Sequence, residues 1–398
     1  MGDRFGMNGM PRDNYVRQDV GVDELWANNI SSGINFSKYE NIKVTVDGDH
    51  NSRTVSKFTD AGLCKLLMSN VDRAGYKTPT PVQKNALPII MDGRDLMACA
   101  QTGSGKTVAF LLPIMNKIIE SRVPSTLCDN GRVGPQAIII TPTRELAIQI
   151  YDEARKFSAG SDIISQVVYG GTSVNSQKYL LNRGCNILVA TPGRLLDFVE
   201  RGFVTFSQVM YLILDEADRM LDMGFMPDIR RCVGNPSMPA KNLRQTLMFS
   251  ATFPPEIRRS AQEFLNNHLF LKVGLVGGAC SDVKQTFLQA AKFEKRDKLL
   301  DLLKNPSRNQ RERTLVFVKT KRNADFLASL LCDEGLDTTS IHGDRLQRER
   351  EEALDDFKSG RRPILVATAV AARGLDIKDV MHVVNYDMPD EVEEYVHR

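Results

Sequence analysis

A short segment at residues 100–107 combines glycines, a lysine and a threonine in an order that suits phosphate binding. It consists of Ala100, Gln101, Thr102, Gly103, Ser104, Gly105, Lys106 and Thr107, after the apolar run 96–99 and before a helical pattern at 108–119. Glycines let main-chain N–H groups turn toward an anion, and the start of a helix presents its positive end to that anion. We therefore expect a P-loop in which Lys106 contacts the β- and γ-phosphates of ATP and the Thr107 hydroxyl binds Mg²⁺. Ala100 stands where the usual pattern has glycine, so a glycine-rich turn is the alternative.

Two carboxylates, Asp215 and Glu216, directly follow the apolar run 211–214. An open α/β sheet binds its ligands at the carboxyl ends of its strands, and we expect this strand to lie beside the P-loop strand. We predict that Asp215 holds Mg²⁺ through water and that Glu216 polarises the water that attacks the γ-phosphate. The alternative is that these acids only begin a helix. The P-loop upstream favours the hydrolytic interpretation.

Short apolar runs alternate with helical patterns in two series. The first series is 96–99, 137–140, 166–168, 187–190, 211–214 and 246–249, and the second is 286–289, 314–318, 338–341, 364–367 and 382–385. Strands that are apolar throughout, rather than at every second residue, are typical of parallel sheets covered by helices on both faces. The sequence therefore predicts an α/β protein with two parallel-sheet domains in tandem.

The texture of the chain also predicts where the domains divide. We expect a mostly disordered tail at 1–55 that docks in places, a first domain at 56–273, a linker at 274–284 and a second domain at 285–398. The tail is rich in Asn, Gly, Asp and Ser, and the linker is rich in small and turn residues.

The composition excludes several classes of protein. The 398 residues carry a net charge of +3, with 42% hydrophobic and 25% charged residues, which argues against wholesale disorder and against coating nucleic acid by bulk charge. A local basic groove remains compatible with this balance. No apolar run approaches the roughly 18 residues of a membrane helix. The seven Cys include no Cys-x-x-Cys pair, so we expect no disulfide framework and no zinc site, but a reducing compartment, cytosol or nucleus.

Taken together, these motifs resemble the DEAD-box RNA helicases, which are named for the four letters at 215–218. The resemblance runs from residue 58 to residue 398 and implies two RecA-like domains, ATP and Mg²⁺ as ligands and RNA as partner. It also implies that Gln83, in the segment 75–83, hydrogen-bonds the adenine edge and that Phe58 stacks on the adenine face. A carboxamide offers the donor and acceptor that this edge requires. Taken alone, Gln83 would be a surface residue and Phe58 a core residue.

Other segments resemble the family's RNA contacts. In the first domain these are Pro142, Thr143, Arg144, Gly170, Gly171, Thr191, Pro192, Gly193 and Arg194, and in the second they are Thr320, Lys321, Gln347, Arg350 and Thr368. They offer what a sugar-phosphate backbone needs, namely positive forks, hydroxyls and main-chain N–H groups. For Arg350 the alternative is a solvated helix face at 348–352. Ala369 stands where many relatives have Asp, which puts a hydrogen bond from that side chain in doubt.

Three further residues complete the resemblance. Ser250 and Thr252 belong to a segment that links hydrolysis to strand separation in the family, and we count both with the catalytic set. Asp376 is implied to bind the ribose hydroxyls. The family's last motif begins with His-Arg, as at 397–398, and continues to two further arginines that contact the γ-phosphate. Because an arginine finger contributes about 10³–10⁵ in rate, we expect a chain without them to bind nucleotide but hydrolyse it slowly. The alternative is that the sequence is a partial one.

The resulting prediction is an ATP-dependent RNA helicase that binds the RNA backbone in a cleft closed by ATP and separates strands or remodels ribonucleoprotein. A nucleotide-gated RNA clamp with little ATPase is the alternative, and a DNA motor is less favoured. Within the family, the runs 35–39, 93–101 and 225–229 are similar to the germ-line branch, although a translation-helicase branch shares much of them. The germ-line branch implies granule proteins as partners and cytoplasmic, perinuclear granules as the location, with the nucleus as an alternative.

Overall fold

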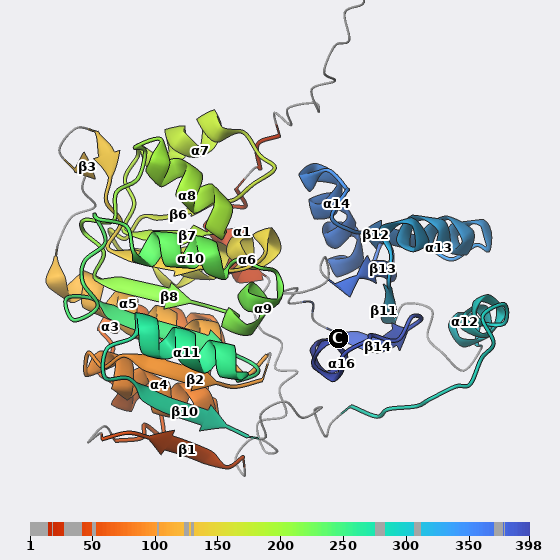
Figure 1. The fold of residues 1–398 in the computed structure, drawn as a ribbon, viewed down its shortest axis with the longest axis horizontal. Coiled ribbons are helices and arrows are strands. Elements are labelled where there is room, and N and C mark those ends of the chain that lie inside the picture. Colours follow the sequence, from red (N-terminus) through yellow and green to blue (C-terminus); the bar gives the residue numbers. More distant parts are fainter. Residues whose placement is uncertain are drawn as a thin grey trace, which may run out of the picture.

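The computed structural model describes residues 15–17, 19–27, 42–49, 53–101, 103–122, 127–128, 131–274, 283–305, 312–369, 377 and 379–398. These residues form two α/β domains in tandem, each built on its own sheet (Figure 1). The expected fold class is therefore confirmed. No helix in these ranges has the length and apolarity to cross a bilayer.

The first domain contains an eight-stranded sheet. Its strands are β1 (Val44–Asp47), β2 (Leu96–Cys99), β5 (Ala137–Ile140), β6 (Ser165–Val168), β7 (Ile187–Ala190), β8 (Tyr211–Leu214), β9 (Gln245–Ser250) and β10 (Leu269–Val273). Their order is β1-β10-β2-β9-β8-β5-β7-β6, and every pairing is parallel except that of β1 with β10. A small hairpin joins β3 (Leu127–Cys128) to β4 (Arg132–Val133). The carboxyl ends of the parallel strands consequently share one edge of the sheet.

Helices cover both faces of this sheet. One face packs on α3 (Lys65–Arg73), α4 (Pro81–Met91), α5 (Lys106–Ser121) and α6 (Arg144–Phe157), and the other on α7 (Val174–Leu181), α8 (Pro192–Glu200), α9 (Ala217–Asp222), α10 (Met226–Val233) and α11 (Pro255–Phe264). Strand β5 shows the consequence, because Ala137 and Ile139 enter one core while Ile138 and Ile140 enter the other. A strand buried on both faces has to be apolar at every position.

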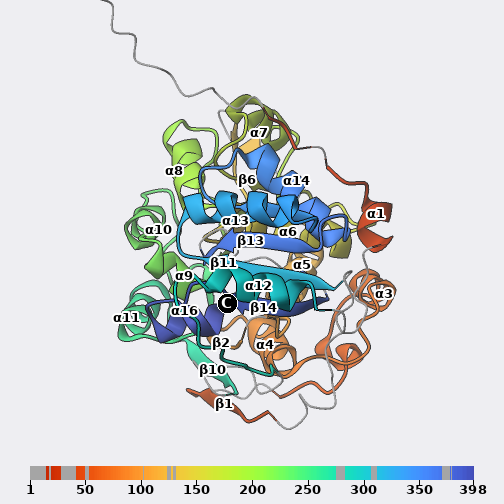
Figure 2. The ribbon, with the colours of Figure 1, turned by 90° about the vertical axis from the view of Figure 1, so that its right-hand side faces the viewer.

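The second domain repeats this architecture on a smaller scale. Its four parallel strands are β11 (Arg313–Val318), β12 (Thr338–Ile341), β13 (Ile364–Thr368) and β14 (Val380–Asn385), in the order β12-β13-β11-β14. The helices α12 (Lys295–Leu303) and α13 (Lys321–Asp333) cover one face, and α14 (Gln347–Lys358) covers the other. Figure 2 shows α12 and α13 in front of this sheet, with the first domain behind it. The last helix is α16 (Val392–His397).

The expected strands are confirmed except for the run 286–289, for which the prediction is wrong. That stretch has no regular structure, and Phe287 and Leu288 are exposed. Sequence reasoning also missed β10, in which buried residues alternate with partly buried ones. A strand with this pattern lacks the continuous apolar run that indicated the others. Of the expected linker at 274–284, residues 275–282 lie outside the described residues, so the linker stays a prediction.

The expected tail at 1–55 needs a correction. Strand β1, within this range, extends the first sheet by pairing with β10. Helix α1 (Val22–Ala27) docks on α6, and its Trp26 is buried. The first domain therefore begins earlier than residue 56 in the described segments, because short apolar segments can cover the sheet edge and a helix face without a sustained period of their own.

Asp95, just before β2, ties three strands together at the opposite end of the sheet from the loops described below. Its Oδ1 accepts a hydrogen bond from the Thr246 N–H at 2.8 Å and its Oδ2 accepts one from the Asn266 N–H at 2.7 Å. Burial raises the pKa of this carboxyl, and the two backbone hydrogen bonds and Arg244 oppose the rise. Asp95 thus satisfies two main-chain donors, one in β9 and one just before β10.

Replacing Asp95 with alanine should destabilise the first domain, because both N–H groups lose their acceptor. A buried donor left unpaired costs about 1–3 kcal/mol, and of the two donors only the Thr246 N–H is buried, so Asp95→Ala is expected to lower the free energy of unfolding by about 1–3 kcal/mol. Urea unfolding followed by circular dichroism measures this change. Asp72→Ala, on the exposed side of α3, is the control and should change stability by less than about 0.5 kcal/mol. Equal unfolding midpoints for the two variants would contradict the role given to Asp95.

Candidate nucleotide and RNA site

The sequence-predicted residues of the first domain gather at the carboxyl edge of its sheet. The P-loop follows β2, the acid pair follows β8, and the segment 250–252 ends β9. The expected RNA contacts follow β5, β6 and β7 on the same sheet. One expectation needs a correction, because β9 lies between β2 and β8, so the acid strand is not the immediate neighbour of the P-loop strand.

The P-loop curls between β2 and α5. Gly103 and Gly105 have φ angles of 76° and 86°, in the left-handed region that glycine tolerates. Lys106 is buried, and its Nζ donates to the Ala100 carbonyl oxygen at 2.8 Å. Ser104 Oγ is also buried and has no hydrogen-bond partner among the described residues. Thr102 lies outside the described residues.

These features fit a bound phosphate chain. The first N–H groups of a helix have no acceptor within the helix. Helix α5 begins at Lys106, directly after the P-loop glycines, so its free N–H groups lie at this loop. A buried hydroxyl without a partner and a buried ammonium complete a set of donors around one place. Such a set suits an anion with several oxygens.

The acid pair lies within electrostatic reach of Lys106. Burial raises the pKa of Asp215 to about 7, the Lys106 ammonium opposes this rise, and the charge of Glu216 adds to it. Within the described ranges no three His, Cys, Asp or Glu side chains cluster as a metal cage. Mg²⁺ commonly takes only one or two carboxylates beside phosphate oxygens and water, so the Thr107 hydroxyl and Asp215 are a donor set that fits it.

Glu216 adopts a strained main-chain conformation. Its φ and ψ are 55° and 50°, which is uncommon for a residue with a side chain, and it directly precedes α9. The Arg219 Nη1 donates to Glu216 Oε2 at 3.2 Å, and both side chains are buried. A strained residue held by a buried partner is typical of functional sites, because the surrounding structure has to maintain it.

Asp218 connects the acid loop to the end of β9. Its N–H donates to Ser250 Oγ at 3.2 Å, and its Oδ2 accepts hydrogen bonds from the Thr252 N–H at 2.8 Å and the Thr252 hydroxyl at 2.9 Å. The Ala100 N–H in turn donates to the Ser250 carbonyl oxygen at 3.0 Å. Ser250 and Thr252 thus connect Asp218 to the P-loop, and their place in the catalytic set stays a prediction.

Gln83 and Phe58 are both buried. The Gln83 carboxamide accepts from the Thr80 N–H at 2.9 Å and donates to the Gly105 carbonyl oxygen at 3.1 Å. Phe58 packs edge-on against Tyr76, with ring centroids 6.2 Å apart. The structure thus joins Gln83 to the P-loop, and its contact with adenine stays a prediction that requires the amide to exchange partners. Phe58 is packed in the core, and its stacking on adenine likewise stays a prediction.

The expected RNA contacts of the first domain form one cluster. Gly171 has a φ of 83°, which favours glycine, and a Cβ at this position would displace the Arg144 guanidinium. Thr143 caps α6 by accepting from the Leu146 N–H, and Thr191, Pro192 and Gly193 begin α8. Arg194 Nη1 donates to Gln177 Oε1 at 3.1 Å. Arg144, Gly170, Gly171 and the segment 191–194 thus follow the neighbouring strands β5, β6 and β7, and their RNA contacts stay predictions.

In the second domain, Gln347 and Arg350 contact the first domain. Arg144 Nη1 donates to Gln347 Oε1 at 3.0 Å, and Arg350 Nη2 lies 2.8 Å from Glu145 Oε1. The alternative of a solvated helix face is wrong for Arg350, which is 8% exposed, although it fits the exposed pair of Arg348 with Glu352. The side chains of Gln347 and Arg350 thus bind the first domain, a contact that their sequence pattern did not predict.

The other residues expected in the second domain lie at strand ends or helix starts. Thr320 caps α13 by accepting from the Asn323 N–H at 3.2 Å, Lys321 pairs with Asp344, and Thr368 ends β13. Asp376 lies outside the described residues. Sequence reasoning missed Asp218, Arg219, Glu145 and Glu351 as members of the site. Only the charges beside the recognised motifs could have indicated the first three.

Two family models match the chain. The DEAD/DEAH box helicase model matches residues 80–260, and the helicase conserved C-terminal domain model matches residues 294–398. ATP-dependent RNA helicase vasa from Drosophila melanogaster is 54% identical over 97% of this chain and 57% of its own length. Probable ATP-dependent RNA helicase DDX4 from Homo sapiens is 54% identical over 98% of this chain and 53% of its own length. The chain therefore spans about half the length of these relatives.

Solved structures are similar as well. Dbp5 from S. cerevisiae, bound to RNA and ADP BeF3, gives a TM-score of 0.74 at 30% identity, covering 86% of this chain and 85% of that one. Prp28 from Chaetomium thermophilum, bound to ADP, gives 0.53 at 37% identity, covering 89% and 82%. The two matched models, the identity to vasa and the shared two-domain fold lead to one conclusion: this chain belongs to the DEAD-box helicase family.

Proposed function

We propose that this protein is an ATP-dependent RNA helicase that grips the RNA backbone between its two domains when ATP is bound. The carrying observation is that Lys106 and Asp215 meet at one sheet edge while α14 contacts the same side of the first domain through Arg144 and Glu145. The names of the relatives and the RNA bound to Dbp5 support the proposal.

The proposed nucleotide grip depends on main chain. The P-loop N–H groups, Ser104 Oγ and Lys106 Nζ would hold the phosphates, with Lys106 exchanging the Ala100 carbonyl oxygen for phosphate oxygen. Thr107 and Asp215 would hold Mg²⁺, which, when bound, neutralises charge on the phosphates. The adenine end lies toward Gln83, whose amide contacts the same loop at Gly105.

Glu216 is the residue that we assign to the chemical step. Its carboxylate would accept a hydrogen bond from the attacking water, and Arg219 holds that carboxylate in place from 3.2 Å. The contacts of Asp218 with Ser250 and Thr252 would transmit the state of the phosphate site to the end of β9. Asp376 would contact the ribose hydroxyls.

RNA would be held mainly through its backbone. The cluster around Arg144, Gly171 and Arg194 offers positive forks and main-chain N–H groups, which recognise phosphate without reading bases. We therefore propose sequence-tolerant binding of single strands or short duplexes. From the resemblance to vasa we also propose ribonucleoprotein partners, germ-line expression and a location in cytoplasmic, perinuclear granules. We also propose a first domain at 56–273 to which β1 and α1 add, a linker at 274–284 and a second domain at 285–398.

The tight approach of Gly105 to Gln83 provides a test of the nucleotide grip. A Cβ on Gly105 would lie 2.5 Å from Gln83 Nε2, whereas a Cβ on Gly103 would meet nothing within 4 Å, and both glycines have positive φ. Gly105→Ala is therefore expected to weaken binding of a fluorescent ATP analogue about tenfold more than Gly103→Ala, since the displaced Gln83 amide loses its hydrogen bonds with Thr80 and Gly105, at about 1.4 kcal/mol. Equal affinities of the two variants would show that the contact with Gln83 does not shape the site.

Glu216→Gln tests the catalytic assignment. The neutral amide cannot polarise water as the carboxylate does, so the rate of phosphate release should fall by about 10²–10⁴-fold. Binding of the ATP analogue should persist, because Lys106 and the loop are intact. Glu256→Gln, on the exposed start of α11, is the matched control with an unchanged rate. A Glu216→Gln variant as active as the control would place the base elsewhere.

The proposed activity itself is tested by release of a labelled strand from a short RNA duplex. Wild-type protein should release the strand with ATP, at a low rate where the two further arginines of the family's last motif are absent, and should only retain RNA with a non-hydrolysable analogue. Glu216→Gln should retain RNA in both cases. Retention without release by the wild type with ATP would contradict helicase activity and would favour the clamp instead.

A further inference from the structure

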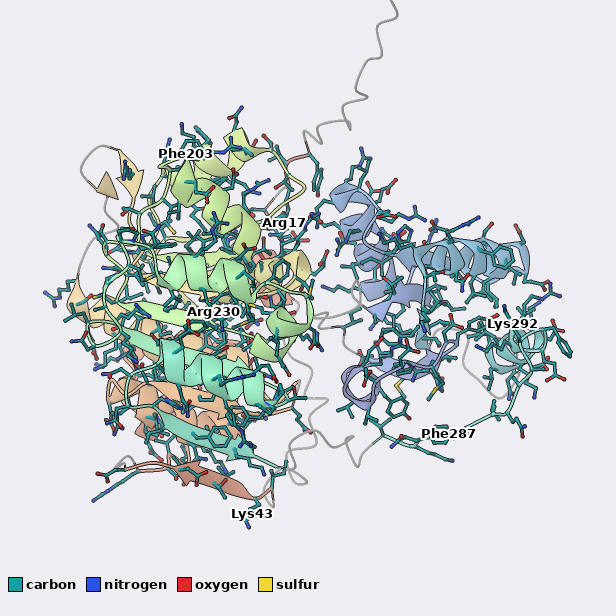
Figure 3. The ribbon with its side chains drawn as sticks, viewed as in Figure 1. Arg17, Lys43, Phe203, Arg230, Phe287 and Lys292 are labelled. Atoms are coloured by element: carbon teal, nitrogen blue, oxygen red, sulfur yellow. The ribbon has the colours of Figure 1, made fainter. Side chains whose placement is uncertain are left out.

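A segment before the first matched family model lies along α6 of the first domain. We name the residues 15–17 and 19–27 the N-terminal strap. Arg17 Nη2 donates to Asp152 Oδ2 at 2.7 Å, and the Tyr151 hydroxyl donates to Asp19 Oδ2 at 2.8 Å. Arg155 adds a hydrogen bond to the Val20 carbonyl oxygen at 2.8 Å. Figure 3 labels Arg17 on the side of the first domain that faces the second.

The carboxyl end of the strap is anchored by an aromatic contact. Trp26, in α1, is 5% exposed and lies under the Arg73 guanidinium, 4.5 Å from the ring centroid. Lys156 lies 5.5 Å from the same centroid. Cation–π contacts together with burial hold α1 between α3 and α6. The strap is therefore fastened to the first domain along its whole described length.

The amino end of the strap reaches the second domain. The Tyr15 carbonyl oxygen accepts from the Ser173 N–H at 3.3 Å, in the loop that follows Gly170 and Gly171. The Tyr15 hydroxyl donates to Glu351 Oε2, in α14, at 2.7 Å. Tyr15 thus binds both domains at once, with its main chain on one and its side chain on the other.

Glu351 is also the centre of the interdomain contact. Its Oε1 accepts from Gln347 Nε2 at 3.0 Å and from the Tyr169 hydroxyl at 3.5 Å, and Gln347 accepts in turn from Arg144. Burial raises the pKa of Glu351, while the hydrogen bonds from Tyr15 and Gln347 oppose this rise. A buried carboxylate depends on such donors, so the loss of one weakens the whole group.

We infer that Tyr15 is a positioning residue that holds α14 against the first domain and thereby favours the arrangement that binds RNA and ATP together. The inference rests on the proposed function, which it extends to a segment outside both matched models. Because the strap is already bound to α6, the Tyr15 hydroxyl is held in position for Glu351. Its hydrogen bond therefore stabilises the closed domains at little cost in conformational entropy. The strap therefore couples the amino-terminal chain to RNA affinity.

Tyr15→Phe removes only the hydroxyl and leaves the ring and the strap in place. Affinity for single-stranded RNA is measured with and without a non-hydrolysable ATP analogue. A hydrogen bond to a charged acceptor contributes about 1.5–3 kcal/mol, so RNA affinity with the analogue should fall about tenfold or more. Tyr179→Phe, an exposed tyrosine on α7, should behave as the wild type.

Glu351→Ala completes a double-mutant cycle. If Tyr15 acts through Glu351, Tyr15→Phe should have no further effect in the Glu351→Ala background. Unchanged RNA affinity of Tyr15→Phe with the analogue, or equal losses with and without Glu351, overturns the inference while leaving the proposed function intact.

The proposed function can fail separately. If wild-type protein binds RNA equally with and without the analogue, the proposed function fails. Small-angle scattering of the ligand-free protein then tests whether Tyr15 holds the two domains together. A larger radius of gyration for Tyr15→Phe than for the wild type then supports the strap as an interdomain fastener. Equal radii overturn it.

Discussion

The structure depends on the burial of opposite charges at one edge of a parallel sheet. Lys106 is 8% exposed, and Asp215, Glu216 and Asp218 are 3%, 7% and 3% exposed. Charges are costly to bury, and each of these groups has a partner, which for Asp215 is the Glu216 N–H at 3.0 Å. Lys106 has the Ala100 carbonyl oxygen, Glu216 has Arg219, and Asp218 has the Thr252 hydroxyl and N–H. The place of β9 between β2 and β8 makes this arrangement possible, because its carboxyl end joins the P-loop to the acid loop.

The same edge faces the second domain. Arg144 and Glu145, at the start of α6, meet Gln347 and Arg350 on α14. A ligand that contacts both domains favours this arrangement, and two such ligands necessarily strengthen each other's binding. The described polar contacts at the boundary run through single side-chain groups, so changes of one hydroxyl or one carboxylate are expected to shift the balance between closed and separated domains.

Much of the fold is predictable from the sequence, for a physical reason. Strands such as β5 and β7 lie between two layers of helices and are apolar at every position, which the printed sequence shows directly. Strand β10 is buried at alternate positions only, and the apolar residues Phe287 and Leu288 are exposed, so the same rule fails for both. Strand β1 is recognisable only by its partner.

The functional residues were predictable from the sequence where a single local segment forms the binding site. The P-loop follows from glycines and a lysine between a strand and a helix. The partners of Gln83, Arg144 and Arg350 lie 22, 203 and 205 residues away in the chain, and no local pattern indicates such pairs. Residue types thus indicated which side chains matter, whereas their contacts depend on the tertiary structure.

Amide hydrogen exchange with and without ATP and Mg²⁺ tests the central claim most directly, because it reports where the nucleotide binds. The account predicts slower exchange at residues 104–109, at the start of α5, and at 215–218 and 250–252, which the buried charges connect to it. Saturating nucleotide that leaves these amides unchanged while protecting another part of the chain would contradict it.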